Sequence, residues 1–136
     1  MKITEAENAL PNGLHDADLL EVRVDYANRT AALDFLADYS DPDHVRDEPD
    51  RRVTLLVTGL HFISIPVPDL ANKYAADEPA WVQGFDPLLE KDPVTDDVKV
   101  AARHLPPSAF CERTFVSSWN SCLVIAAEDA RIEMKE

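Results

Sequence analysis

The sequence predicts an α+β fold dominated by antiparallel β-structure, arranged as a curved sheet or small sandwich with one or two short helices. Apolar and polar residues alternate with a period of two near both ends of the chain, which is typical of half-buried strands. Ten prolines, mostly clustered between these segments, indicate where regular structure stops. A length of 136 residues that are 46% hydrophobic suits one domain spanning residues 1–136.

The first element is a predicted β-hairpin. The segments 19–26 and 30–38 alternate in polarity, and a two-residue loop at Asn28-Arg29 would place their apolar faces together. Arg23 would then lie opposite Asp34 on the solvent-exposed face, which also holds Leu19 and Leu36. The apolar pairs expected from this register are Val24 with Leu33 and Val22 with Phe35.

The next strand is expected in residues 51–67. Val53, Leu55 and Val57 alternate with polar residues until Gly59, which indicates a bulge or a bend. The strand can resume after Gly59 and continue until Pro66 ends it.

Residues 68–108 form a polar, proline-rich connection that is expected to be partly helical. One or two helical turns are predicted in residues 69–75. A short helix is predicted in residues 95–105, with Thr95 as its N-cap and His104 near its end, against the alternative of a strand. The expected inward side chains of this helix are Val98, Ala102 and Leu105. The side chains expected to anchor the connection to the core are Trp81, Phe85, Leu88 and Leu89.

A second hairpin is predicted from residues 109–118 and 121–129, and residues 130–134 prolong it or begin a new strand. A two-residue loop at Trp119-Asn120 would pair Ser117 with Cys122. Cys111 would then lie about 20 Å along the neighbouring strand, at ~3.3 Å per residue. Because a disulfide requires Cα atoms within roughly 7 Å, both thiols are predicted to be free.

The chain is strongly acidic, with 26 Asp and Glu against 13 Lys and Arg and a net charge of −13. This charge repels nucleic acid and anionic membranes and favours a basic protein as partner, although an acidic surface also serves solubility alone. The start of the chain lacks the apolar region of a secretory signal, and the longest apolar stretch, residues 55–67, is too short for a membrane span. We therefore expect a cytoplasmic protein.

Candidates for a catalytic or metal site are few: His15, Asp16 and His61. An adjacent His-Asp pair can bind a divalent metal, but no other histidine stands at ligand spacing from it. The alternative is structural: Asn12-Gly13 forms a turn, His15 bonds a backbone carbonyl and Asp16 caps the start of the strand. With three scattered glycines and no G-x-S-x-G motif, the sequence predicts no phosphate-binding loop, no cofactor and no catalytic residue.

The densest acidic stretch runs from Asp38 to Asp50. It lacks the EF-hand pattern of a calcium loop, so a solvated loop or a docking surface for a basic partner is expected instead. Trp119, at the predicted hairpin tip, either anchors a partner or folds back onto the sheet. The candidate partner-binding residues are Asp38, Asp41, Asp43, Asp47, Glu48, Asp50 and Trp119.

The opening LPNGLHDADLLEVRVDYANRTAALDF, residues 10–35, resembles the start of a group of small bacterial proteins of unknown function. In that group a His-[Asp/Ser]-Ala step leads into a strand, a short turn and a second strand, and some polymorphic-toxin immunity proteins are similar at this level. The resemblance implies a β-rich cytoplasmic protein without catalysis that binds a toxin.

The sequence thus favours a non-catalytic binding protein, with an immunity-like inhibitor of a basic partner as its specific form. One alternative is a small-ligand or metal-dependent enzyme with a cleft near His15, Asp16 and His61. The other is a homo-oligomeric structural protein that pairs edge strands or buries Trp81 and Phe85 between copies. The oligomeric state stays open at this point.

Overall fold

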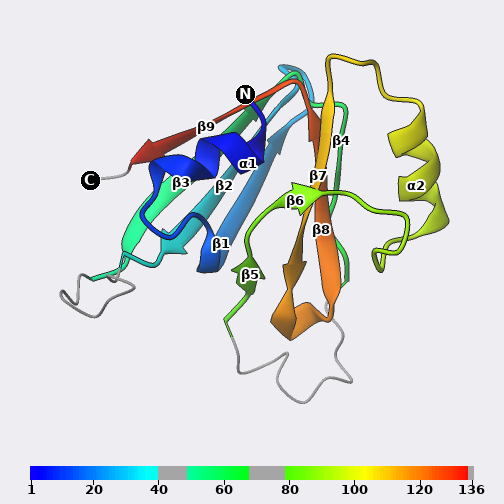
Figure 1. Cartoon of the computed structure of the whole chain (residues 1–136). Helices are drawn as coiled ribbons and strands as arrows, with labels where there is room; N and C mark the ends of the chain where they lie inside the picture. Colours follow the sequence, from blue (N-terminus) through cyan, green and yellow to red (C-terminus); the bar gives the residue numbers. More distant parts are fainter. Residues whose placement is uncertain (40–48, 68–78, 135–136) are drawn as a thin grey trace.

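The computed structural model describes residues 1–39, 49–67 and 79–134, and these form the predicted α+β fold, mostly antiparallel β-sheet with two short helices. Figure 1 shows two sheet layers that splay apart from a common upper edge. The first layer contains β1 (His15–Asp25), β2 (Thr30–Ala37), β3 (Arg51–Thr58) and β9 (Asp129–Met134). The second contains β4 (Phe62–Ser64), β6 (Asp86–Pro87), β7 (Phe110–Val116) and β8 (Ser121–Ala127).

The two layers belong to one hydrogen-bonded sheet that does not close. The strand order is β4-β8-β7-β5-β1-β2-β3-β9, with β6 attached to β7. The short strand β5 (Trp81–Gln83) links the layers on one side because it pairs with both β1 and β7. In the described residues no helix is both long enough and apolar enough to cross a membrane.

On the other side the layers are joined at a corner made by Gly59 and Glu128. Gly59 separates β3 from β4 and has a φ of +62°, and Glu128 separates β8 from β9. The Glu128 amide donates to the Thr58 carbonyl at 3.1 Å, so the β3–β4 and β8–β9 connections cross between the layers at the same point. The bend predicted at Gly59 is therefore confirmed.

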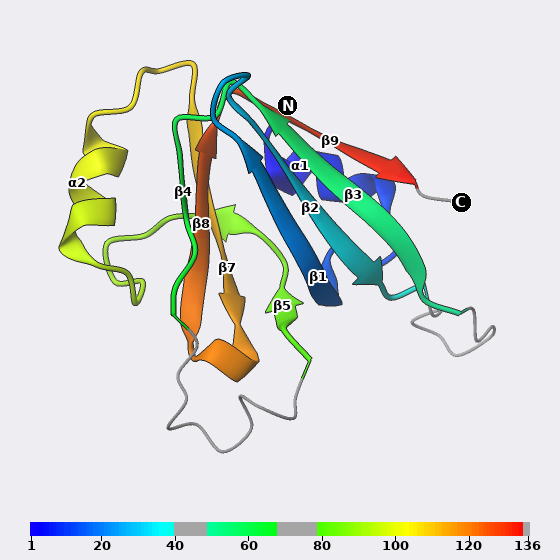
Figure 2. The ribbon, with the colours of Figure 1, turned by 180° about the vertical axis from the view of Figure 1, so that it is seen from behind.

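The hydrophobic core fills the space between the layers. The helix α1 (Ile3–Ala6) and the 3-10 turn η1 (Glu7–Ala9) lie across the inner face of β9, β3 and β2 (Figure 1). The largest fully buried apolar side chains include Ile3, Leu14, Leu33, Phe35, Leu55, Leu123 and Ile125. Figure 2, from behind, shows that no helix of the described residues covers the outer face of the first layer.

The first hairpin forms, but its register differs from the prediction by two residues. Val24 pairs with Ala31 and Val22 with Leu33, so the loop has four residues rather than two. A shift of two preserves the faces, and the four side chains of the predicted apolar pairs do contact the core. Leu20 and Tyr26, which the alternation also placed on the inner face, are exposed instead. Asp34 differs from expectation because it is buried, although Arg23 still reaches it diagonally at 2.6 Å.

A register shift in β1 between Leu19 and Glu21 explains where the leucines lie. The irregularity at Leu20 is a β-bulge, which changes the face on which the preceding residues lie. Leu19 consequently packs against the core, not on the polar face as predicted, and Leu20 is half exposed.

The second hairpin is also shifted by two residues. Val116 pairs with Ser121 and Phe115 with Cys122, because the 3-10 turn η2 (Ser117–Trp119) and Asn120 together make a four-residue loop. The predicted pairing of Ser117 with Cys122 is wrong, but both cysteines are free as predicted. Residues 129–134 form a new strand, β9, in the other layer.

The connection contains the predicted helix as α2 (Asp96–Arg103), with Thr95 at its N-cap and His104 at its C-cap. The strand alternative is therefore wrong. The helix lies outside the second layer, on the side away from the first (Figures 1 and 2). The helical turn predicted in residues 69–75 lies outside the described residues.

Of the predicted anchors of the connection, only Phe85 is fully buried. Leu88 is half-buried, and Trp81 and Leu89 are each 44% exposed. Val82, rather than Trp81, points from β5 into the core because adjacent strand residues face opposite sides of a sheet.

Candidate functional site

Four aspartates gather at one end of the first layer, where β1 begins, β2 ends and β3 begins. In the register, Asp18 pairs with Leu36, and Leu36 pairs with Arg52. Asp38 and Asp50 lie two residues beyond this row, about 7 Å further along at the spacing of extended chain. Asp16 precedes Asp18 by two residues, with a left-handed φ of +62° at a register shift of β1. We call Asp16, Asp18, Asp38 and Asp50, with Trp81, the acidic edge.

The electrostatics of Asp18 show that these carboxylates influence one another. Its pKa is raised, first because partial burial disfavours the charged form and then because Asp50 is close, while a hydrogen bond with Trp81 opposes the shift. Asp18 Oδ1 is buried without a hydrogen-bond partner among the described residues. Trp81 pairs with Asp18 across β1 and β5, and 44% of it stays exposed.

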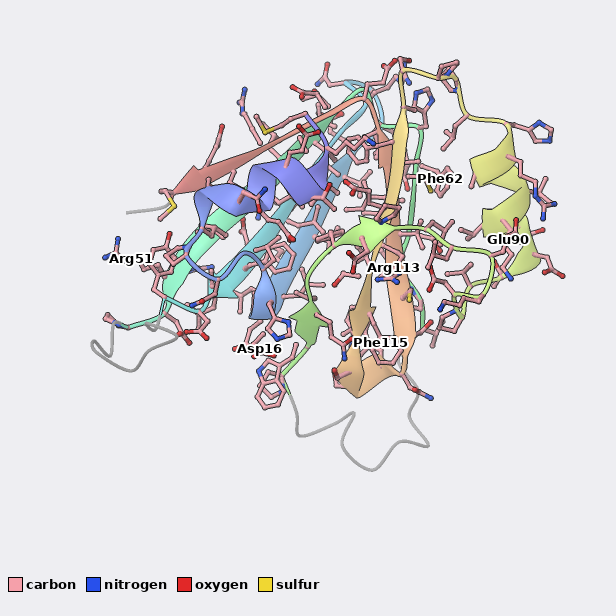
Figure 3. All side chains as sticks on the ribbon, in the orientation of Figure 1. Asp16, Arg51, Phe62, Glu90, Arg113 and Phe115 are labelled. Atoms are coloured by element: carbon pink, nitrogen blue, oxygen red, sulfur yellow. The ribbon has the colours of Figure 1, made fainter. Side chains whose placement is uncertain are left out.

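Basic residues border the acidic edge. Arg51 lies over the ring of Tyr39, 4.7 Å from its centroid, in a cation–π contact. Arg52 is exposed beside it. Figure 3 shows Asp16 and Arg51 at the same end of the first layer. Four carboxylates against two guanidinium groups leave the acidic edge net negative.

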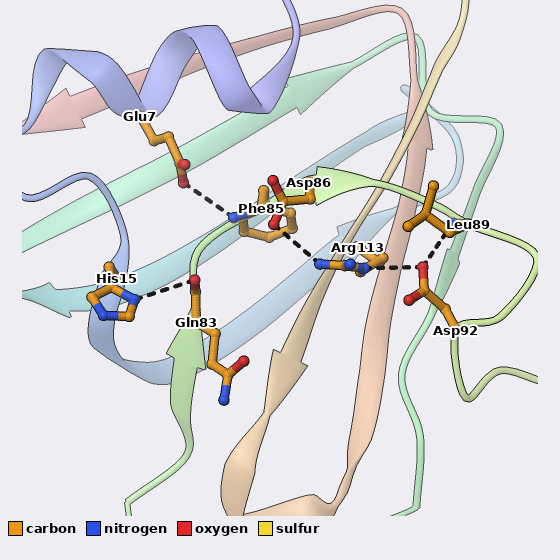
Figure 4. Close-up of polar contacts among 8 residues, drawn as sticks. All are labelled: Glu7, His15, Gln83, Phe85, Asp86, Leu89, Asp92 and Arg113. Atoms are coloured by element: carbon orange, nitrogen blue, oxygen red, sulfur yellow. Dashed lines mark hydrogen bonds and ion pairs between the residues drawn. The ribbon is translucent and has the colours of Figure 1, made fainter.

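His15 and Asp16 lie on the acidic edge as an exposed pair. His15 donates from Nδ1 to the Gln83 carbonyl at 3.3 Å, and its Nε2 lies 3.6 Å from Asp16 Oδ2 (Figure 4). Gly13 has a φ of +56°, as the turn predicted at Asn12-Gly13 requires. These contacts match the structural interpretation, in which His15 fastens the start of β1 to β5.

The structure does not bring His61 together with His15 and Asp16. His61 lies beside Arg29, whose Nη2 is 3.5 Å from His61 Nδ1, at the far end of β1. The strand from His15 to Asp25 has 11 residues and spans roughly 30 Å at ~3.3 Å per residue. Shared metal ligation or proton transfer needs near contact, so these residues do not form one cleft.

The other predicted partner-binding residues are only partly covered by the structure. Asp41, Asp43, Asp47 and Glu48 lie outside the described residues, but the segment that holds them leaves and re-enters the described chain at the acidic edge. Trp119 is half-buried against the core, as expected for an aromatic side chain that folds back onto the sheet. In the described part of the chain, no three His, Cys, Asp or Glu side chains are grouped as a metal site.

A second polar cluster, not anticipated from the sequence, surrounds Arg113 on the outer face of β7 (Figure 4). Arg113 donates from Nε to Asp92 at 3.0 Å and from Nη1 to Asp86 at 3.2 Å. Asp92 also accepts a hydrogen bond from the Leu89 amide at 2.7 Å. With its polar atoms paired internally, this cluster fastens the connection to the second layer.

Asp18 and Trp81 were missed because their role depends on strand pairing between distant segments. The rest of β1 and all of β2 separate residue 18 from residue 50, and Trp81 follows only after β3 and β4. The local signal was the closeness of Asp16 and Asp18 in sequence, and the positive φ of Asp16 (+62°) interrupts the regular strand between them. No protein-family model, no curated protein and no solved structure matches this chain, so the candidate site is defined by its geometry alone.

Proposed function

We propose that this protein is a non-catalytic binding protein whose acidic edge docks onto a basic protein surface. The observation that carries the proposal is the convergence of four carboxylates beside a half-exposed tryptophan on a chain of net charge −13. Charge of one sign steers an oppositely charged partner and accelerates association.

The composition of the acidic edge supports binding rather than solubility alone. Tryptophan is among the residues that contribute most to protein interfaces, and charged residues around such an anchor confer orientation and specificity. Trp81 exposes apolar surface next to Asp18, where an interface would cover it. The acids of residues 41–48 adjoin this surface in sequence and would add to its negative potential.

The specific form that we propose is an immunity-like inhibitor that covers a basic surface of a toxin. Two features support it: the acidic charge and the resemblance of residues 10–35 to proteins of that kind. A toxin that binds nucleic acid has a basic surface, and an acidic inhibitor can cover it by mimicking the charge of the nucleic acid.

The test is an affinity capture at low salt from the cells that make the protein, using three forms of the chain. The edge variant carries Asp16→Asn, Asp38→Asn and Asp50→Asn. A control variant carries an equal charge change away from the acidic edge, through Glu90→Gln, Asp96→Asn and Asp97→Asn. All six positions are at the surface or half-buried, and exposed ion pairs contribute little to stability.

A basic partner retained by the wild type and the control but lost by the edge variant would support the proposal. Its affinity should also fall with added salt, because exposed charges are screened over a Debye length of about 8 Å at physiological ionic strength. Equal retention by the edge variant, or recovery of no protein partner, would contradict the proposal.

A further inference from the structure

A cavity of about 340 Å³ opens between the start of α1 and the segments that flank β7. Its walls combine apolar groups with carboxylates. Its apolar lining includes Pro87, Pro107 and Phe110, and Glu5, Glu112 and Glu128 supply the acids. This cavity lies at the opposite end of β3 from the acidic edge, roughly 25 Å away at ~3.3 Å per residue.

Glu112 is the unusual member of this set because it is only 1% exposed. Its Oε1 accepts a hydrogen bond from the Thr4 amide at 3.2 Å. Its Oε2 is buried and has no hydrogen-bond partner among the described residues. A buried carboxylate oxygen without a donor costs stability, so this oxygen is an unused acceptor, which a donor in the cavity would reach after a shift of the side chains that cover it.

The surroundings of Glu112 favour a positively charged donor. Burial raises the pKa of Glu7, and the charges of Glu112 and Asp86 raise it further, which shows that negative charge accumulates beneath α1. Two cations also line the cavity: the Met1 amine, which contacts Asp129, and Lys2, which is exposed. Because the Met1 amine is paired with Asp129, Lys2 is the cation that remains to balance the three carboxylates that line the cavity. The cavity is therefore net negative.

The shape and chemistry of the cavity select among cations. A divalent metal prefers several oxygen ligands, and no group of three candidate ligands is found in the described residues. An alkylammonium ion instead needs one carboxylate for its charged head and apolar walls for its methylene groups. We infer that this cavity binds an alkylammonium group, with Glu112 Oε2 accepting from the ammonium head and Pro87, Pro107 and Phe110 contacting the alkyl chain.

This inference does not depend on the proposed function, since a small amine tests it directly. Two sources share the chemistry: a free amine, and the side chain of a partner's lysine. The probes are n-butylammonium chloride, its neutral analogue 1-butanol, and the peptide acetyl-Gly-Lys-Gly-amide. Each is titrated into the full chain while the backbone amide signals of Thr4, Phe110 and Glu112 are followed by NMR.

The expected result is saturable shifts with n-butylammonium and none with 1-butanol. Glu112→Gln keeps an acceptor for the Thr4 amide but removes the charge, so it should weaken binding roughly tenfold or more. Ala109→Trp should block the cavity and leave Glu112 in place, which provides a second test if Glu112→Gln does not fold. Asp96→Asn, an equal charge change on α2, should leave binding unchanged.

Binding of the peptide as tightly as n-butylammonium would identify a lysine of a partner as the source, and binding of n-butylammonium alone would identify a free amine. Either outcome supports the cavity as an ammonium site. Shifts that do not saturate, or equal binding by wild type, Glu112→Gln and Ala109→Trp, would overturn the inference. The edge variant should bind n-butylammonium normally, so failure of the proposed function would be seen separately.

Discussion

Replacing Gly59 by alanine tests the corner that joins the two layers. Two costs are expected. The φ of +62° places a non-glycine residue in the left-handed region, which costs about 1–2 kcal/mol. An added Cβ would also lie 2.6 Å from Glu128 Oε2 and 2.9 Å from Glu128 Cβ, and relieving such overpacking costs a further 1–3 kcal/mol or so.

Gly13 provides a matched control for the first cost alone. Its φ is +56°, but the nearest atom to an added Cβ, Glu7 Cδ, is 3.6 Å away, an ordinary contact distance. Gly13→Ala should therefore cost about 1–2 kcal/mol. Gly59→Ala should cost about 3 kcal/mol in total, since it adds the steric term.

The assay is equilibrium unfolding in urea, monitored by tryptophan fluorescence, for the wild type and both variants. A third measurement places Gly59→Ala in a Glu128→Gly background, where the opposing side chain is absent and the excess cost should disappear. Equal destabilisation by Gly13→Ala and Gly59→Ala, or an undiminished excess in the Glu128→Gly background, would refute the steric argument.

Three further predictions concern titratable groups. Burial and the charge of Glu112 raise the pKa of Cys111 to about 11, so its thiolate should be about 100-fold scarcer than in a free cysteine. A disulfide reagent at pH 8 should therefore modify it roughly 100-fold more slowly in the folded protein than after unfolding in urea, and equal rates would contradict this. Because burial and neighbouring charges raise the pKa of Glu7, its contribution to stability is present below its ordinary value of 4.5 and is lost as pH rises. Glu7→Gln should therefore gain stability relative to wild type between pH 4 and pH 7 in urea titrations, and a constant difference would argue against this. Burial disfavours the ionised form of Asp92, but the hydrogen bond from the Leu89 amide and the charge of Arg113 outweigh burial and lower the pKa of Asp92. The stability that ionised Asp92 contributes is therefore present at neutral pH and is lost as pH falls below the ordinary value of 3.8. Asp92→Asn should cost about 2 kcal/mol at pH 7 and much less near pH 2, and thermal melts that show the same loss at both pH values would contradict this assignment.

The period-two pattern predicted which residues face the core, but it could not predict the register. A shift of two residues leaves every side chain on its face, so polarity alone does not distinguish the two registers. The longer loop in the first hairpin is stabilised by Asp25, which accepts hydrogen bonds from the Asn28 amide and side chain at 3.1 and 2.8 Å. Recognising this Asp-Asn turn in the sequence would have favoured the four-residue loop.

The register of the second hairpin was predicted wrongly for a related reason. Asn120 has a φ of +52°, a conformation that asparagine tolerates better than most residues, and it ends the turn η2. The bend at Gly59 was predictable from the glycine alone. The contact between Gly59 and Glu128 was not predictable, because nothing in the sequence around residue 128 indicates which distant segment lies against it.

The acidic edge was partly predictable. Asp38 and Asp50 were identified from the local density of acids, whereas Asp18 and Trp81 joined them only through the pairing of β1 with β2 and β5. The cavity beside Glu112 was not predictable, since the alternation in β7 places Glu112 inward but gives no sign that one of its oxygens lacks a hydrogen-bond donor among the described residues.

The pairing of β3 with β9 has a consequence for how the chain is made. On the ribosome, β3 is synthesised some 70 residues before β9, so its outer edge has no neighbour until residues 129–134 emerge. An unpaired strand edge is a template for association with other chains, and contacts so distant in sequence form slowly. The nascent chain should therefore be most prone to aggregation after β3 has formed and before β9 is available.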